Sequence, residues 1–147
     1  MERHTERLGI ASLVEFRGRV DGMQKFQLMA NAYAVLVPSR YETFGMVAVE
    51  SQAVGTPVVA FRVGALSEST GTQGIHLVSP FDLQAFACTV ADLIKNPENA
   101  TNQRAARRQW ATQYDWDYTA TKQEKHYLAA LEHHADTSAR RHSDTLR

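Results

Sequence analysis

Two apolar runs, AVLV at 34–37 and VVAF at 58–61, limit what this chain can fold into more than any other feature. Their apolar residues are consecutive rather than alternating, as expected of strands that are covered on both faces. A helical pattern lies between them, from Gly45 to Val54, and Gly55 follows where a helix C-cap glycine belongs. Such strands joined by a helix predict an α/β fold, a Rossmann-like parallel sheet flanked by helices.

The alternation of strand and helix extends in both directions. An apolar run from about Leu13 to Phe16 predicts an additional strand, and DGMQKFQLMANA after it has helical spacing. Downstream, IHLVS predicts a fourth strand and DLQAFACTVADLI another helix. Residues 97–134 are helical in pattern, with four aromatic residues expected to dock on the rest of the fold: Trp110, Tyr114, Trp116 and Tyr118.

Length and composition predict one folded unit. The 147 residues suit a single domain, which we expect to cover residues 1–134. Residues 135–147 are polar and without periodicity, so we expect a disordered, frayed tail there. Cys88 is the only cysteine and lies in an apolar pattern, which favours a small buried side chain over a nucleophile.

Charge and the N-terminus exclude several classes of function. Sixteen basic and sixteen acidic residues leave a formal net charge of zero, which argues against nucleic acid or an anionic membrane as a partner. The N-terminal MERHTERLGI has no apolar segment typical of a signal peptide or membrane span, so we expect a cytoplasmic protein. His133 and His134 are adjacent and therefore point in different directions on a helix, so we expect no metal site.

The loop PSRYETFG follows AVLV and leads into the next helix. In a doubly wound sheet, ligands bind beyond the carboxyl ends of the strands, where this loop lies. Gly45 would allow a ligand to approach the backbone, and the helix that begins there offers free N–H groups and a positive dipole end to an anion. The sequence therefore predicts a ligand site at this loop.

Two glutamates lie in this region. Glu50 has only apolar neighbours three and four positions away on the helix, so its carboxylate needs a partner, such as a ribose diol. The alternative for Glu50 is a partly exposed side chain that reaches solvent. Glu42 precedes the helix, where it could equally complement the helix dipole or form a capping box with Ser39.

The segment PSRYETFGMVAVESQAVGTPVVAFRVGALSE resembles the donor-binding segment of retaining glycosyltransferases of the GT-B fold, in the large family 4 (group 1). That family has two glutamates separated by seven residues, then an A-x-G-x-P-V-V strand and a V-G-G-L-x-E loop. Glu42 and Glu50 match the pair, and the resemblance covers most of residues 8–130. It implies the C-terminal half of a GT-B fold, which binds a nucleotide diphosphate sugar as donor and uses no further cofactor.

The resemblance also implies roles for individual residues. Glu42 would be the catalytic residue that holds the donor sugar, and Glu50 would hold the ribose. The remaining donor-binding positions would contact the sugar, the diphosphate or, for the first two, the nucleobase, and they are Arg19, Val20, Ser39, Phe44, Gly45, Met46 and Val47.

The chain departs from the family in two ways. Ala65 stands where the family usually has a second glycine. The N-terminal acceptor-binding domain of the family, and a basic pair that neutralises the leaving diphosphate, have no counterpart in these residues. Preorganised cations are a large part of such catalysis. We therefore expect an incomplete donor-binding part that is weakly active or inactive alone and needs an N-terminal acceptor-binding domain or subunit.

Two other functions stay open at this point. The chain could be a non-catalytic module that binds a nucleotide sugar, which the missing parts favour. It could also be an epimerase with a GT-B-like fold, which has only the fold in its favour. The sequence leaves the base and sugar of the donor and the acceptor undetermined.

Overall fold

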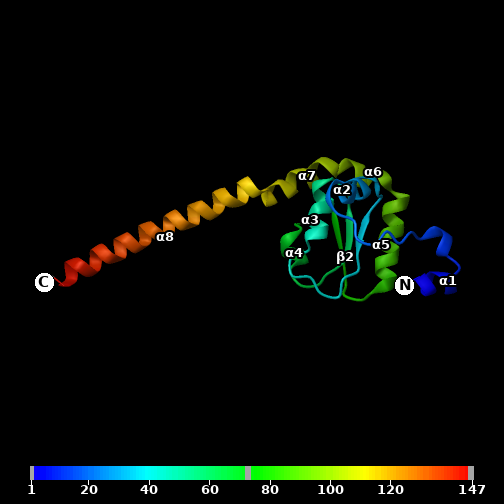
Figure 1. Cartoon of the computed structure of the whole chain (residues 1–147), viewed down its shortest axis with the longest axis horizontal. Coiled ribbons are helices and arrows are strands. Elements are labelled where there is room, and N and C mark those ends of the chain that lie inside the picture. The colour runs from blue at the N-terminus through cyan, green and yellow to red at the C-terminus, as the bar shows by residue number, and fades with distance from the viewer. Residues whose placement is uncertain (1, 72–73, 146–147) are drawn as a thin grey trace.

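A parallel sheet of three strands forms the centre of the computed structural model, which describes residues 2–71 and 74–145 (Figure 1). The strands are β1 (Val35–Val37), β2 (Val58–Phe61) and β3 (Ile75–Val78), and they lie side by side in sequence order. Both pairs are parallel, with Val35 opposite Val58 and Val58 opposite Ile75. The predicted α/β fold with a Rossmann-like parallel sheet is confirmed.

Helices cover both faces of β2, and this explains its uninterrupted apolar sequence. On one face, Val58 and Ala60 pack with Ala48 of α3 (Met46–Ala53) and Leu66 of α4 (Leu66–Ser69). On the other face, Val59 and Phe61 pack with Phe86 of α5 (Leu83–Lys95). All four residues of β2 are buried, and each large apolar side chain stabilises the fold by about 1.5–3 kcal/mol.

Two further helices connect this core to the end of the chain. α2 (Gly22–Asn31) precedes β1 and contacts α3. After α6 (Pro97–Asn102), α7 (Arg104–Ala111) packs along α3 and leads through the short 3-10 helix η2 (Thr112–Tyr114) into α8. The predicted helices before β1, before β2 and after β3 are therefore confirmed.

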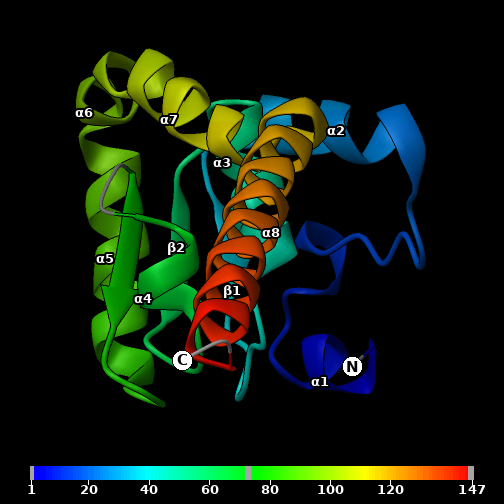
Figure 2. The same ribbon diagram turned by 90° about the vertical axis from the view of Figure 1, so that its left-hand side faces the viewer.

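α8 (Trp116–Thr145) leaves the domain as one long helix, and its far end lies at the opposite end of the molecule from α1 (Figure 1). In Figure 2 this end of α8 faces the viewer. The expected docking of aromatic residues is confirmed for Trp110 and Tyr114, which are half-buried. It is wrong for Trp116 and Tyr118, whose side chains are 86% and 46% exposed, because they lie on the part of α8 that projects from the domain. The helix also continues through position 135, where the sequence suggested the start of a tail; residues 146 and 147 lie outside the described residues.

The strand predicted from Leu13 to Phe16 is wrong. The chain begins with α1 (Glu2–Arg7) and the 3-10 helix η1 (Ala11–Leu13), and the residues up to Asp21 form no strand. Val14 has an extended backbone, but a β-strand also needs a partner, and β1 pairs only with β2 among the described residues. Leu13, Val14 and Phe16 are exposed, and so is Leu36 on β1.

Cys88 is exposed, so the prediction of a buried cysteine is also wrong. α5 turns Phe86, Val90 and Leu93 toward the sheet, at the spacing of one helix face. Cys88 lies two positions from Phe86 and so falls on the opposite side of the helix. Small apolar residues surround it in sequence, which hides this periodicity.

Candidate functional site

The loop after β1 ends at Gly45, which is the N-cap of α3 and has a left-handed backbone with φ of +83°. A Cβ atom at this position would overlap the side chain of Leu66. Both constraints require glycine. The loop and the start of the helix therefore lie where the sequence predicted them, at the carboxyl end of β1.

The first turn of α3 presents backbone N–H groups at this end of the sheet. The N–H groups of Ala48 and Val49 donate to the carbonyl of Gly45 at 2.9 and 3.2 Å. Those of Met46 and Val47 come before the first bond within the helix, so they are available to a ligand. Together with the helix dipole, they make this helix start suitable for an anion such as a diphosphate.

The backbone of Glu42 is fixed by the loop that follows β2. The N–H group of Ala65 donates to the carbonyl oxygen of Glu42 at 3.2 Å, and a Cβ atom on Gly64 would overlap the same oxygen. Ser69 donates from Oγ to the carbonyl oxygen of Phe44. The two loops thus hold each other, and Glu42 is half-buried.

Two questions about this loop are answered by its geometry. A capping box of Ser39 with Glu42 is excluded, because Gly45 is the N-cap of α3 and no side chain bonds to the first turn. The alanine at position 65 has φ of −84°, which any residue adopts. The loop therefore has no need of a second glycine there.

Glu50 lies one turn further along α3, and its carboxylate is paired. Lys25 of α2 donates from Nζ to Oε1 of Glu50 at 2.6 Å, and the two side chains are 30% and 19% exposed. The partner that an isolated carboxylate requires is therefore a lysine. The side chain is partly exposed, as in the alternative interpretation, but its carboxylate is paired with Lys25.

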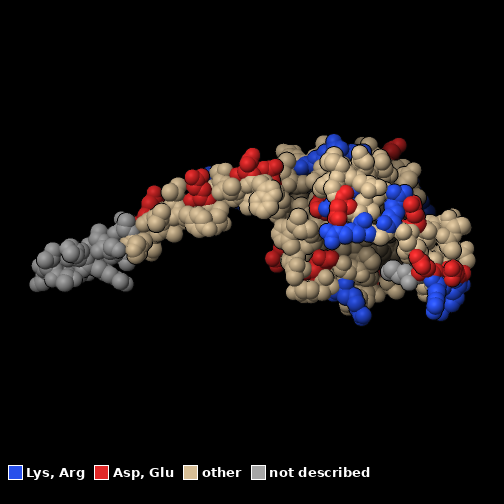
Figure 3. All heavy atoms as spheres, in the orientation of Figure 1, with Lys and Arg blue, Asp and Glu red and all other residues tan. Residues whose placement is uncertain are grey.

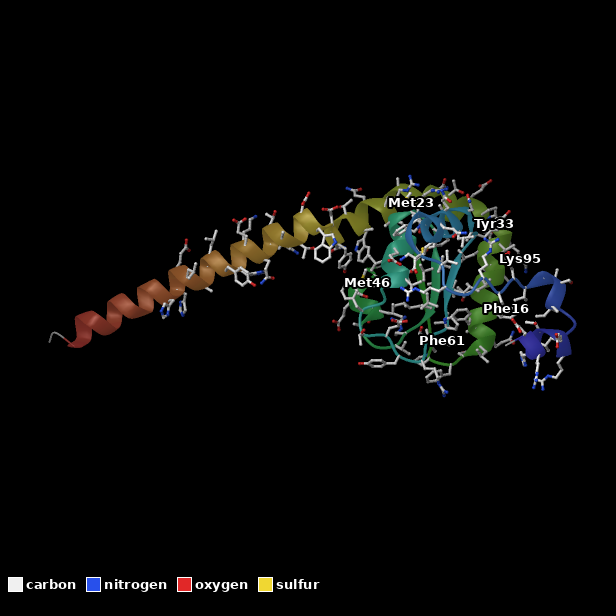
Figure 4. The ribbon with its side chains drawn as sticks, in the orientation of Figure 1. Phe16, Met23, Tyr33, Met46, Phe61 and Lys95 are labelled. Atoms are coloured by element: carbon white, nitrogen blue, oxygen red, sulfur yellow. The ribbon has the colours of Figure 1, made fainter. Side chains whose placement is uncertain are left out.

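Glu50 also lines a cavity of about 420 Å³ between α2, α3 and the α7–η2 turn. Met46, one turn earlier on α3, lines the same cavity, and Figure 4 shows it on the side of the domain from which α8 leaves. Phe44 does not line the cavity, but its ring packs edge-on against that of Tyr114, which does, with the ring centroids 5.4 Å apart. The other lining residues are Phe26, Val49, Ala53, Arg108, Ala111, Thr112 and Asp115.

Of the predicted site residues, only Glu50 and Met46 line this cavity. Glu42, Phe44, Gly45 and Val47 lie outside it, in the loop before α3 and at the start of that helix. Arg19, Val20 and Ser39 are not brought to it either. Arg19 is exposed, and its Nε atom donates to Oδ2 of Asp21 at 2.7 Å. Val20 and Ser39 are half-buried, and none of the three lines the cavity beside Glu50. Arg19 and Val20 lie in the segment just before α2, the helix that carries Lys25.

Sequence reasoning missed Lys25 and the polar interior near α7. Lys25 and Glu50 are 25 positions apart, so no local spacing links them. Arg107 of α7 is 1% exposed, and burial together with the charge of Arg104 lowers the pKa of its guanidinium. Burial and the charge of Arg107 likewise lower the pKa of His76 on β3.

Beyond this site, the structure also bears on charge, metal-ligand groups and membrane-spanning helices. On the face shown in Figure 3, basic and acidic side chains are interspersed rather than gathered into one patch. Among residues 2–71 and 74–145, no group of three or more His, Cys, Asp or Glu side chains is arranged to hold a metal ion. None of the helices described is both long enough and apolar enough to traverse a lipid bilayer.

Comparison with known proteins supplies the context of the site. The model of a family described as "Glycosyl transferases group 1" matches residues 1–96. A glycogen synthase of Mycobacterium tuberculosis is 36% identical over 118 residues, 78% of this chain and 28% of the relative. A D-inositol 3-phosphate glycosyltransferase of Streptomyces scabiei is 35% identical over 144 residues, 97% of this chain and 32% of the relative.

Solved structures agree with these sequence relatives. The sucrose-phosphate synthase of Thermosynechococcus elongatus superposes with a TM-score of 0.80 and 28% identity, over 89% of this chain and 33% of that protein. The Anabaena protein HepE, in complex with UDP, superposes with a TM-score of 0.74 and 28% identity, over 87% of this chain and 35% of that protein. The chain thus spans about a third of the length of the proteins it matches.

Proposed function

Because the chain belongs to the family of glycosyl transferases group 1, we propose that it is the donor-binding part of an enzyme that moves a sugar from a nucleotide sugar to an acceptor. In more detail, we propose that the chain is the C-terminal half of a GT-B enzyme of family 4. The whole enzyme would transfer the sugar with retention of configuration and without a metal ion. Two relatives are named as sugar-transferring enzymes, and one structural neighbour is a complex with UDP.

Glu50 is the observation that carries this proposal. It is a paired, mostly buried carboxylate that lines a cavity, and it lies one helical turn from the free N–H groups at the start of α3. A carboxylate accepts hydrogen bonds from a diol, and a helix start binds phosphate. A nucleoside diphosphate offers a ribose diol and a diphosphate that are joined by one short linkage, which suits this arrangement.

The roles of the other residues follow the same arrangement. Glu42 would hold hydroxyl groups of the donor sugar and be the catalytic residue. The N–H groups of Phe44, Gly45, Met46 and Val47 would contact the sugar and diphosphate, with Ser39 beside them. Arg19 and Val20 would approach the nucleobase, since they precede the helix that carries the partner of Glu50.

A second candidate is a module that binds a nucleotide sugar without transferring it. Among the residues that the structure describes, Arg108 is the one basic residue lining the cavity. Its guanidinium already donates to the carbonyl of Val54, at 3.3 Å from Nε and 3.2 Å from Nη2. Departure of a nucleoside diphosphate builds negative charge that cations must stabilise. We expect the 147-residue chain by itself to bind a donor better than it transfers the sugar, and an N-terminal acceptor-binding domain or subunit to be its partner.

Ligand-detected NMR tests the binding function. The purified chain is titrated with UDP, GDP and ADP and with sugars attached to each. We expect saturable binding of one nucleotide, weakened about tenfold or more by Glu50→Ala, since hydrogen bonds to a charged group contribute about 1.5–3 kcal/mol each. Glu124→Ala on α8 is the control, because it removes a carboxylate outside the cavity. Equal affinity in the wild type and in Glu50→Ala would reject the ribose role.

The variant Glu42→Ala distinguishes binding of the donor's sugar from binding of its nucleotide. This variant should bind the free nucleoside diphosphate as the wild type does, but lose the additional affinity for the matching nucleotide sugar. Release of nucleoside diphosphate from the donor, measured on the same samples, distinguishes an enzyme from a binding module. Binding without release favours the module.

A further inference from the structure

The ion pair between Lys25 and Glu50 joins two helices at the proposed donor site. The Nζ atom of Lys25 on α2 lies 2.6 Å from Oε1 of Glu50 on α3. The same ammonium group lies 4.9 Å from the centroid of the neighbouring Phe26 ring. Lys25 is therefore held both by a carboxylate and by an aromatic face, and both contacts restrict its long side chain.

The two residues face the cavity differently. Glu50 lines the cavity of about 420 Å³, whereas Lys25 does not. The ammonium group therefore approaches the carboxylate from the side of α2, and the cavity side stays open. A carboxylate has two oxygens with about four acceptor positions, and the contact with Lys25 uses Oε1 alone.

A glutamate has three rotatable side-chain bonds, and holding it in one orientation costs conformational entropy. The residues around Glu50 on the cavity wall include Met46, Val49 and Phe26, which offer a carboxylate no hydrogen bond. Within the described residues, Lys25 is the only hydrogen-bonding or ion-pairing partner of the Glu50 carboxylate. The orientation of the Glu50 carboxylate thus depends on Lys25.

We propose that Lys25 is a positioning residue. It holds Oε1 of Glu50 so that the carboxylate can accept hydrogen bonds from both ribose hydroxyls of the donor nucleotide. This inference rests on the proposed function of the same site. It assigns to Lys25 the preorganisation of the carboxylate before the donor arrives, since a group that is already oriented loses less freedom on binding.

The test compares UDP with 2′,3′-dideoxyuridine 5′-diphosphate, which lacks both ribose hydroxyls, by isothermal titration calorimetry. The ratio of the two dissociation constants reports how strongly the hydroxyls are recognised. We expect the wild type to prefer UDP by about tenfold or more. In Lys25→Met, which keeps an unbranched apolar stem but removes the ammonium group, the preference should fall to within about threefold, whereas Lys25→Arg should retain most of it.

Arg17→Met is the matched control, because it breaks an ion pair with Glu15 of 2.8 Å that is exposed and lies before α2. It should leave the preference unchanged. If Lys25 only stabilised the fold, Lys25→Met would weaken both nucleotides by one factor and leave their ratio as in the wild type, which would overturn the inference. No binding of either nucleotide to the folded wild type would overturn the proposed function for UDP, and the role of Lys25 with it.

Discussion

The Nε atom of Arg107 donates a hydrogen bond of 2.9 Å to the carbonyl oxygen of Gly55, across 52 positions of sequence. Arg104 and Arg108, on the same helix, both donate to the carbonyl of Val54. These carbonyls lie at the C-terminal end of α3, where the helix dipole is negative. Three arginines of α7 therefore hold the helix that carries Glu50.

Replacing Arg107 should destabilise the chain more than replacing Arg104. Arg107→Met removes a buried donor and leaves the Gly55 carbonyl without it, which we expect to lower the free energy of unfolding by about 1.5–3 kcal/mol. Arg104 is exposed and its bond is 3.4 Å long, so Arg104→Met should cost less than about 1 kcal/mol. Urea unfolding of both variants measures the difference, and equal losses would contradict it.

Gly45→Ala should damage both the fold and the proposed site. The new Cβ atom would overlap Leu66, and the backbone would be strained at φ of +83°, at a cost of about 1–3 kcal/mol for each effect. Gly9→Ala is the control, because Gly9 also has a positive φ but no atom within 4 Å of the added carbon. Thermal unfolding should show a clearly larger drop for Gly45→Ala. A drop as small as that of Gly9→Ala would disprove the overlap.

His76 should make stability fall in mild acid. Burial, with the charge of Arg107, holds the pKa of His76 below its ordinary value in the folded chain. The unfolded chain therefore binds more protons at this histidine than the folded chain does. Above about pH 6.5 the imidazole is neutral in both states and has no effect on the free energy of unfolding, but protonation lowers that free energy as the pH falls toward the pKa of His76 in the folded chain. His76→Gln should reduce the loss of stability between pH 7.5 and pH 5.5, as measured by urea unfolding. An unchanged loss would show that other groups cause it.

Cys88 should react with a thiol reagent in the native state. Its side chain is exposed on α5, and it is the only cysteine of the chain, so the released chromophore reports it directly. We expect one equivalent to react with 5,5′-dithiobis(2-nitrobenzoic acid) at a rate that adding urea below the unfolding transition does not change. Reaction only after unfolding would mean that the thiol is buried.

The sheet and its helices could be predicted because β1, α3 and β2 each carry their own local signal. The consecutive apolar residues of β2 reflect burial on both faces, and Gly55, with its positive φ, ends α3 as expected. The same reasoning failed at Leu13–Phe16, because an apolar run indicates only that a strand is possible. Whether a strand forms depends on a partner edge, which no local pattern contains.

The candidate site was predictable to a similar degree. Glu50 and Gly45 stand out by position, one among apolar residues and one at a helix start. Lys25 could not be found in this way, because its contact with Glu50 depends on how α2 packs against α3. Arg107 was missed for the same reason: its burial follows from the packing of α7 on α3, and arginine is seldom buried.

Each strand of the sheet pairs with the strand that comes next in sequence, through a single intervening segment. Pairing with the next strand closes the shortest loop available to each strand, and the entropy cost of loop closure rises with loop length. During synthesis, β1, α3 and β2 can therefore assemble as soon as they have emerged. Pulse-labelled hydrogen exchange would detect this as early, simultaneous protection of their amides. On the second face of β2, Val59 and Phe61 pack with Phe86 of α5, so this face can be covered only after that later helix has been synthesised.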